Sequence, residues 1–171
     1  MKLWKLQREL NRTKEQIAGG FELLMGARRT ATHDAQRAEM NSVTQGNLPL
    51  LDAVAAVLIF QRGDIPQTLL ITLRQLSDAG YSPLVISNAP LTDATRTTLA
   101  TQSWRIVERP NVGYDFGGYR EAILHLQDEA IQPKRLILMN DSVWTVDHLF
   151  PGFLTRVQQD GADLSGNVIR Q

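Results

Sequence analysis

A continuous apolar run, VAAVLIF at Val54–Phe60, is the feature that most constrains how this chain can fold. An apolar run without polar alternation is typical of a β-strand that is buried on both faces, as strands of parallel sheets are. The run is far shorter than the ~20 residues that span a bilayer. Because the chain has 171 residues and is 43% hydrophobic, we expect one domain, with or without an appendage, built around this strand.

Further short apolar runs follow this strand, and helical patterns separate them. The runs predict strands at Leu84–Ser87, Trp104–Val107 and Arg135–Met139, with a further strand starting at Ala162–Val168. The helical patterns cover Thr68–Ala79, Thr92–Thr101, Gly117–Asp128 and Phe150–Gln158. Alternation of strands and helices at this spacing predicts an α/β fold with a mostly parallel sheet flanked by helices.

Residues Met1–Gly26 carry an amphipathic helical pattern. Apolar side chains recur at helical spacing, at Leu3, Leu6, Leu10, Ile17, Phe21 and Leu24. Such a helix docks on its own domain or on a partner, forms a coiled coil, or lies on an anionic membrane surface with Trp4 near the headgroups. The polar segment Ala27–Gly46 either extends the helix or is a linker. We therefore expect a helix and linker at residues 1–46 and a compact domain at 47–171.

Charge and cysteine content exclude several classes of function. The formal net charge of zero gives no argument for nucleic-acid binding, and no such partner is expected. The absence of cysteine excludes disulfides and cysteine–zinc sites. Residues Met1–Leu10 alternate basic and apolar side chains without the apolar core of a signal peptide. The sequence therefore indicates a soluble, cytoplasmic protein.

A glycine-rich segment, RPNVGYDFGGYR at Arg109–Arg120, follows the third predicted strand. Its glycines do not have the spacing of a dinucleotide-binding loop, and no Walker lysine follows them. A helix that begins here presents free N–H groups that suit a phosphate, and Gly117 lets a ligand or a strand approach closely. The alternative is a tight turn that Asp115 caps. The rings of Tyr114, Phe116 and Tyr119 either stack on a base or sugar or contribute to packing.

A second polar cluster, Asn140-Asp141-Ser142, follows the fourth predicted strand. The carboxyl ends of parallel strands meet at one edge of a sheet, where ligands bind, so both clusters are expected to face one crevice. Oxygen-bearing side chains with a carboxylate suit Mg²⁺ that is shared with substrate phosphates. The alternative is a polar strand end at which Asp141 caps the following turn.

These two clusters resemble the rhamnan synthesis protein F family of bacterial polysaccharide glycosyltransferases. The matching motifs are RPNVGYDFGGYREAIL and LILMNDSVW, within a resemblance that covers about Asp52 to Phe150. The resemblance implies a Rossmann-like sheet of the GT-A type. It implies transfer of a sugar, rhamnose, from a nucleotide-diphosphate donor to a glycan or lipid-linked acceptor during cell-surface polysaccharide synthesis. Such a protein would work on the cytoplasmic side of the inner membrane, with residues 1–26 as a peripheral contact.

The resemblance also implies roles for individual residues. Gln61 and Arg62 would line the nucleotide pocket. Ser87 and Asn88 would approach the base or ribose. The wall beside the donor would be formed by Asn111, Gly113 and Asp115, with Arg120 available to a phosphate. The donor site as a whole would comprise Gln61, Arg62, Ser87, Asn88, Asn111, Gly113, Tyr114, Asp115, Gly117, Arg120, Asn140, Asp141 and Ser142.

One departure from the family of GT-A enzymes concerns the metal. Asn140, Asp141 and Ser142 stand where those enzymes carry an Asp-x-Asp motif, so Asp141 is the single expected ligand for Mg²⁺ or Mn²⁺. The base that deprotonates the acceptor is not identified, and its candidates are Asp115, Asp147 and His148.

The chain ends at Gln171, before the later half of such a fold. We expect either part of a longer transferase or a donor-binding module that transfers nothing itself. The same features also fit a non-catalytic interaction module of a polysaccharide assembly complex.

Overall fold

The computed structural model describes residues 26, 28, 30–142 and 149–159, and it divides the chain into two compact units, Met1–Met40 and Asn41–Gln171. Residues 30–40 of the first unit are helical. The amphipathic helix predicted at Met1–Gly26 lies outside the described residues except for Gly26, as does the strand predicted at Ala162–Val168. No helix among the described residues is both long and apolar enough to cross a membrane.

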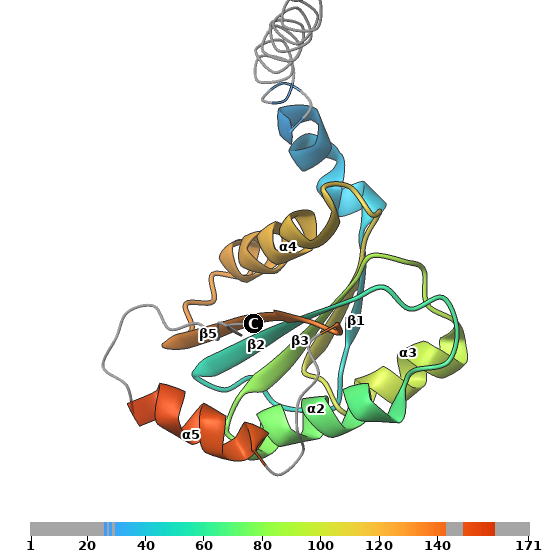
Figure 1. Cartoon of the computed structure of the whole chain (residues 1–171). Helices are drawn as coiled ribbons and strands as arrows, with labels where there is room; N and C mark the ends of the chain where they lie inside the picture. The colour runs from blue at the N-terminus through green and yellow to red at the C-terminus, as the bar shows by residue number, and fades with distance from the viewer. Residues whose placement is uncertain (1–25, 27, 29, 143–148, 160–171) are drawn as a thin grey trace, which may run out of the picture. The chain divides into compact units, whose positions relative to one another are not determined.

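The second unit is a mixed α/β domain in which strands and helices alternate (Figure 1). Its elements in chain order are β1 (Ser42–Gln45), β2 (Ala53–Ile59), α2 (Gln67–Asp78), β3 (Ser82–Ser87), α3 (Asp93–Ala100), β4 (Arg105–Glu108), α4 (Tyr114–Asp128), β5 (Arg135–Asn140) and α5 (Phe150–Gln159). The predicted α/β fold with a mostly parallel sheet flanked by helices is thereby confirmed.

The five strands form one sheet in the order β1-β4-β3-β2-β5. Strand β2 pairs in parallel with β3 and β5, β3 pairs in parallel with β4, and only β1 is antiparallel to its neighbour. From β2 the chain moves outward through β3 to β4, and it then returns across the sheet to place β5 on the other side of β2. The boundary between β2 and β5 is therefore a topological switch point, the place where open α/β sheets bind ligands.

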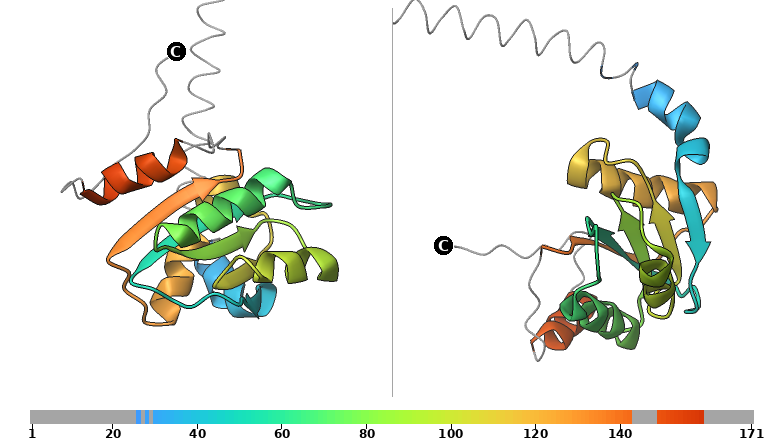
Figure 2. Two further views of the ribbon diagram at one scale, coloured as in Figure 1. Left: turned by 90° about the horizontal axis from the view of Figure 1, so that it is seen from below. Right: turned by 90° about the vertical axis from the view of Figure 1, so that its right-hand side faces the viewer.

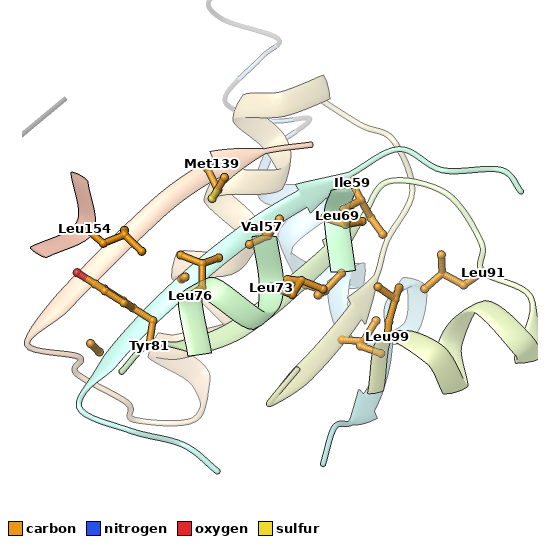
Figure 3. Packing of buried hydrophobic residues seen from close by; sticks show 14 residues of the cluster. Val57, Ile59, Leu69, Leu73, Leu76, Tyr81, Leu91, Leu99, Met139 and Leu154 are labelled. Atoms are coloured by element: carbon orange, nitrogen blue, oxygen red, sulfur yellow. The ribbon is translucent and has the colours of Figure 1, made fainter. Parts of the chain in front are cut away.

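Helices cover both faces of the sheet (Figure 1 and Figure 2). Helix α4 lies on one face, where Ala122 and Leu126 pack against Ala56 and Leu58 of β2. Helices α2, α3 and α5 lie on the other face, and their side chains pack with those of the strands in the cluster drawn in Figure 3. Because both faces are covered, all seven residues of β2 are buried, which explains its uninterrupted apolar sequence.

Two local features differ from the prediction. Strand β1 lies within the segment expected to be a helix extension or linker, and the compact unit begins at Asn41 rather than at residue 47. This strand has the polar sequence SVTQ and pairs with β4 at the edge of the sheet, so it carries no apolar run. Helix α4 begins at Tyr114, three residues before the predicted Gly117, because Gly113 in the left-handed conformation precedes it.

Candidate functional site

The ends of β2 and β5 are joined by the side chain of Asp141. Its carboxylate oxygen Oδ2 accepts hydrogen bonds from Gln61 Nε2 at 2.7 Å and from the Phe60 backbone N–H at 3.3 Å. The Asp141 backbone N–H donates to the Leu58 carbonyl at 2.9 Å. Asp141 therefore lies at the switch point and holds the loop after β2 against the end of β5.

Helix α4 brings a second carboxylate to the same edge. Asn140 Nδ2 donates to Asp115 Oδ2 at 3.1 Å, which joins the end of β5 to the first turn of α4. The helix can approach β2 this closely because Gly118 has no side chain. A Cβ atom there would lie 2.3 Å from Cδ1 of Leu58. Asp115, Asn140 and Asp141 thus converge although sequence separates Asp115 from the other two.

Tyr119 of α4 responds electrostatically to both carboxylates. Partial burial raises the pKa of its phenol above the ordinary value of 10.0, and the charges of Asp115 and Asp141 raise it further. A negative phenolate would be repelled by both carboxylates, so the hydroxyl stays protonated and remains a hydrogen-bond donor. The first turns of α4 and the end of β5 therefore present two anionic acceptors and one neutral donor.

A buried arginine supports the glycine-rich turn. Only 4% of Arg109 is exposed, and its guanidinium donates to the Asn88 side-chain oxygen through Nη1 and to the Val112 carbonyl through Nη2. Burial lowers the pKa of Arg109, and the charge of the buried Glu121 on α4 opposes that shift. Arg109 thus connects the ends of β3 and β4 with the turn. The predicted site residues did not include Arg109, and its signals in the sequence were its position directly after a strand and its place as the first residue of the RPNVGYDFGGYREAIL motif.

Backbone strain and close approach both shape this turn. Gly113 has a φ of 76° and Tyr114 a φ of 50°, so two successive residues are left-handed. Glycine at 113 supplies the left-handed conformation, whereas Gly117 is required for another reason. A Cβ atom at Gly117 would lie 2.0 Å from the Val112 carbonyl oxygen. The Gly117 N–H donates to the Gly113 carbonyl at 2.9 Å and closes the first turn of α4.

The other predicted site residues differ in what they offer a ligand. Ser87 is fully buried, and its hydroxyl donates to the Ala89 carbonyl at 2.6 Å. Asn88 is also buried and donates to the Tyr114 carbonyl at 3.4 Å. Besides Tyr114 and Asp115, the predicted site residues with exposed side chains are Arg62, Asn111, Arg120 and Ser142. Asp147 and His148, the candidate bases, lie outside the described residues.

The oxygen donors at the switch point are those that a hard divalent cation takes. Carboxylates of Asp115 and Asp141 belong to one local cluster around Asn140 and Tyr119. Within the described part of the chain, no group of three or more His, Cys, Asp or Glu side chains forms a metal cage. Mg²⁺ is commonly bound by one or two carboxylates together with substrate phosphates, and the residues present fit that arrangement.

The fold and this edge define an α/β protein with a polar site at the switch point of a mostly parallel sheet. Residues 84–157, from β3 to α5, match the family model described as Rhamnan synthesis protein F. The resemblance given by the two motifs is therefore confirmed over this part of the chain, and the printed description of that family names rhamnan synthesis.

A curated relative extends the similarity over most of the chain. The chain is 35% identical to an uncharacterized protein, y4gN, of Sinorhizobium fredii over 162 residues, which are 95% of this chain. The same alignment spans 42% of the length of that relative. No solved structure matches the chain.

Proposed function

We propose that this chain binds the nucleotide-diphosphate sugar donor of a glycosyltransferase that acts in polysaccharide synthesis, with rhamnose as the sugar. The observation that carries the proposal is the convergence of Gln61, Asp115, Asn140 and Asp141 at the switch point between β2 and β5. Ligands of open α/β sheets bind at this position. The match of residues 84–157 to the rhamnan synthesis family supports a sugar-transfer chemistry over other uses of the same edge.

In this proposal Asp115 and Asp141 would hold Mg²⁺ or Mn²⁺, which would supply positive charge to offset that of the diphosphate leaving group. The sequence alone offered a single aspartate, and the start of α4 adds the second. Gln61 orients Asp141 by its hydrogen bond to Oδ2. The protonated Tyr119 hydroxyl donates to a phosphate or carboxylate oxygen, and the exposed Arg62 adds positive charge beside the diphosphate.

The alternative function is a donor-binding or interaction module without transferase activity of its own. Its support is that the chain spans 42% of the length of its curated relative. The whole transferase reaction would then need residues that a longer protein supplies. Both functions share the donor site, so the first experiment addresses binding.

We expect the Asp141→Asn variant to bind donor at least tenfold more weakly, a loss of about 1.4 kcal/mol. The substitution keeps the size and hydrogen-bonding oxygen of the side chain but removes its charge, so the melting temperature should change little. Calorimetric titration with nucleoside diphosphates and their sugar conjugates, with Mg²⁺, with Mn²⁺ and with chelator, measures the change. Asp78→Asn, at the carboxyl end of α2, is the matched control. Unchanged donor affinity in the Asp141→Asn variant would contradict the assignment of the donor site.

A further inference from the structure

Three aromatic side chains at the carboxyl edge of the sheet remain unusually exposed. Phe116 keeps 85% of its surface exposed, Tyr114 keeps 76% and Phe60 keeps 45%. Phe60 follows β2 directly, and the other two lie in the first turn of α4. We call Phe60, Tyr114 and Phe116 the aromatic rim. Large aromatic residues normally contribute their area to cores and interfaces, so an exposed group at a ligand-binding edge indicates a contact surface.

Exposure and backbone conformation together argue against a packing role for Tyr114. Its φ of 50° places a bulky residue in the left-handed region, where a side chain other than that of glycine, asparagine or aspartate is rare. The residue gains little burial in return, because most of its surface faces solvent. Backbone strain that is not offset by burial of the side chain is typical of residues retained for binding. The strained turn thus holds an aromatic ring outward at the site.

Polar groups lie directly beside the rim. The ring of Phe116 packs edge to face against that of Tyr119, with ring centroids 6.4 Å apart. The charges of Asp115 and Asp141 in turn raise the pKa of Tyr119. The Phe60 backbone N–H donates to Asp141, and the Arg62 guanidinium lies 5.1 Å from the centre of the Phe60 ring. Two of the three rings therefore have polar neighbours, because Phe60 contacts Arg62 and Asp141, and Phe116 contacts Tyr119.

A saccharide matches this mixture of surfaces. A pyranose ring presents C–H groups on its faces, which pack on aromatic rings. Its hydroxyl groups lie around the edge of the ring and hydrogen-bond to carboxylates and amides. Small-molecule sites bury most of their ligand within a concave pocket. Side chains as exposed as Phe116 and Tyr114 instead suit an extended chain that lies across the edge.

We propose that the aromatic rim binds the growing glycan that accepts the sugar, next to the donor site. The inference rests on the proposed transferase function, and it assigns the second substrate to residues of this chain. The donor diphosphate occupies the polar switch point, and the acceptor chain lies on Phe60, Tyr114 and Phe116.

The test compares two ligands in the full chain, a rhamno-oligosaccharide and a nucleoside diphosphate, by saturation-transfer NMR and calorimetry. We expect the parent to bind both, and Phe116→Ala to lose at least tenfold in affinity for the oligosaccharide while its affinity for the diphosphate changes less than twofold. Leu51→Ala, an exposed apolar residue before β2, is the matched control and should bind both ligands normally. Alanine favours helix and Phe116 is exposed, so folding is expected to be unchanged.

A second variant, Tyr114→Gly, separates binding from structure. Glycine adopts the left-handed conformation without strain, so the melting temperature should rise while oligosaccharide affinity falls. A tyrosine that served the fold would give the opposite change in melting temperature.

The two proposals fail in different ways. If the parent binds diphosphate but no oligosaccharide, or if Phe116→Ala loses only diphosphate, the rim does not bind the acceptor and the inference is overturned. If the parent binds oligosaccharide through the rim but no diphosphate, the acceptor surface stands and the donor site is rejected.

Discussion

At the scale of single residues, the site depends on two carboxylates and a phenol that come from two segments, the first turns of α4 and the end of β5. Asp115 and Asp141 lie around Asn140 and Tyr119, and hydrogen bonds from Gln61 and Asn140 fix the carboxylate oxygens. Two negative charges near each other are costly unless donors or a cation compensate for them. The donors from Gln61, Asn140 and the Phe60 backbone offset part of that cost, and a bound cation would offset more.

The raised pKa of Tyr119 predicts a pH dependence of stability. In the unfolded chain the phenol ionises near its ordinary pKa of 10.0, whereas burial and the two carboxylates keep it protonated in the folded state. The stability it contributes is therefore complete below 10.0 and is lost as the pH rises through the folded pKa. We expect Tyr119→Phe to lose less stability than the parent between about pH 8 and about pH 11, as measured by urea unfolding. Identical pH profiles would contradict the electrostatic environment described for Tyr119.

Sequence reasoning located these residues only in part. Asn140, Asp141 and Gln61 could be predicted because each lies at or just after the carboxyl end of a predicted strand, and such strand ends meet at one edge. The Gln61–Asp141 bond spans 80 residues and the Asn140–Asp115 bond spans 25, so both depend on which strands are neighbours. A linear pattern does not contain that information. The supporting role of Arg109 was missed for the same reason, because its partner Asn88 lies 21 residues away at the end of β3.

At the scale of elements, the start of α4 is the most constrained part of the fold. The left-handed Gly113 and Tyr114 turn the chain into the helix, and Gly117 and Gly118 then pass close to the turn and to β2. This geometry sets the position of Asp115. The turn is thus the element that links backbone conformation to the chemistry of the site.

We expect Gly117→Ala to destabilise the protein by about 2 kcal/mol, because the new Cβ meets backbone that has little room to move. It should also weaken donor binding, since relief of the clash displaces Asp115. Urea unfolding and calorimetry measure the two effects. Gly152→Ala in α5 is the control, because a Cβ there meets nothing within 4 Å, and its stability should rise slightly. A Gly117→Ala protein as stable as the parent would show that the turn can relax.

The helices and strands could be predicted where packing produces a periodic or continuous apolar pattern in the sequence. Strand β2 was predicted to within one residue at each end because both of its faces are buried. Strand β1 was missed because it is short, polar and at an edge. Helix α4 was predicted three residues short because Tyr114, Asp115 and Phe116 are exposed and carry no apolar period. A periodic apolar pattern arises from burial, so it does not predict elements whose residues are exposed.

At the scale of the whole molecule, the chain consists of two units, and the described sheet belongs to one of them. The sheet, its helices and both described hydrophobic clusters belong to the unit Asn41–Gln171. Strand β1 at its beginning pairs with β4, and the Gly46 N–H donates to the Trp104 carbonyl at 2.8 Å. The structural boundary therefore lies before β1 rather than after it.

Two truncations test this boundary. We expect removal of residues 1–40 to leave the melting temperature nearly unchanged, because both described clusters are retained. Removal of residues 1–46 also deletes β1 and its bonds to β4 and should cost about 2 kcal/mol. Thermal and urea unfolding of both proteins measure the difference. Equal stability of the two truncated proteins would show that β1 contributes nothing to the sheet.

The pairing of β5 with β2 has a consequence for the order of folding. The first and last parallel strands in sequence are neighbours in the sheet, and the contact that joins them spans 80 residues. Contacts between distant parts of a chain form late, because the chain loses the entropy of the long intervening loop before the contact can stabilise it. A chain that has formed only β2, β3 and β4 lacks Asn140 and Asp141 at the switch point. A nascent chain would therefore complete the proposed donor site only after β5 has left the ribosome, and a ligand of that site would selectively stabilise the completed fold.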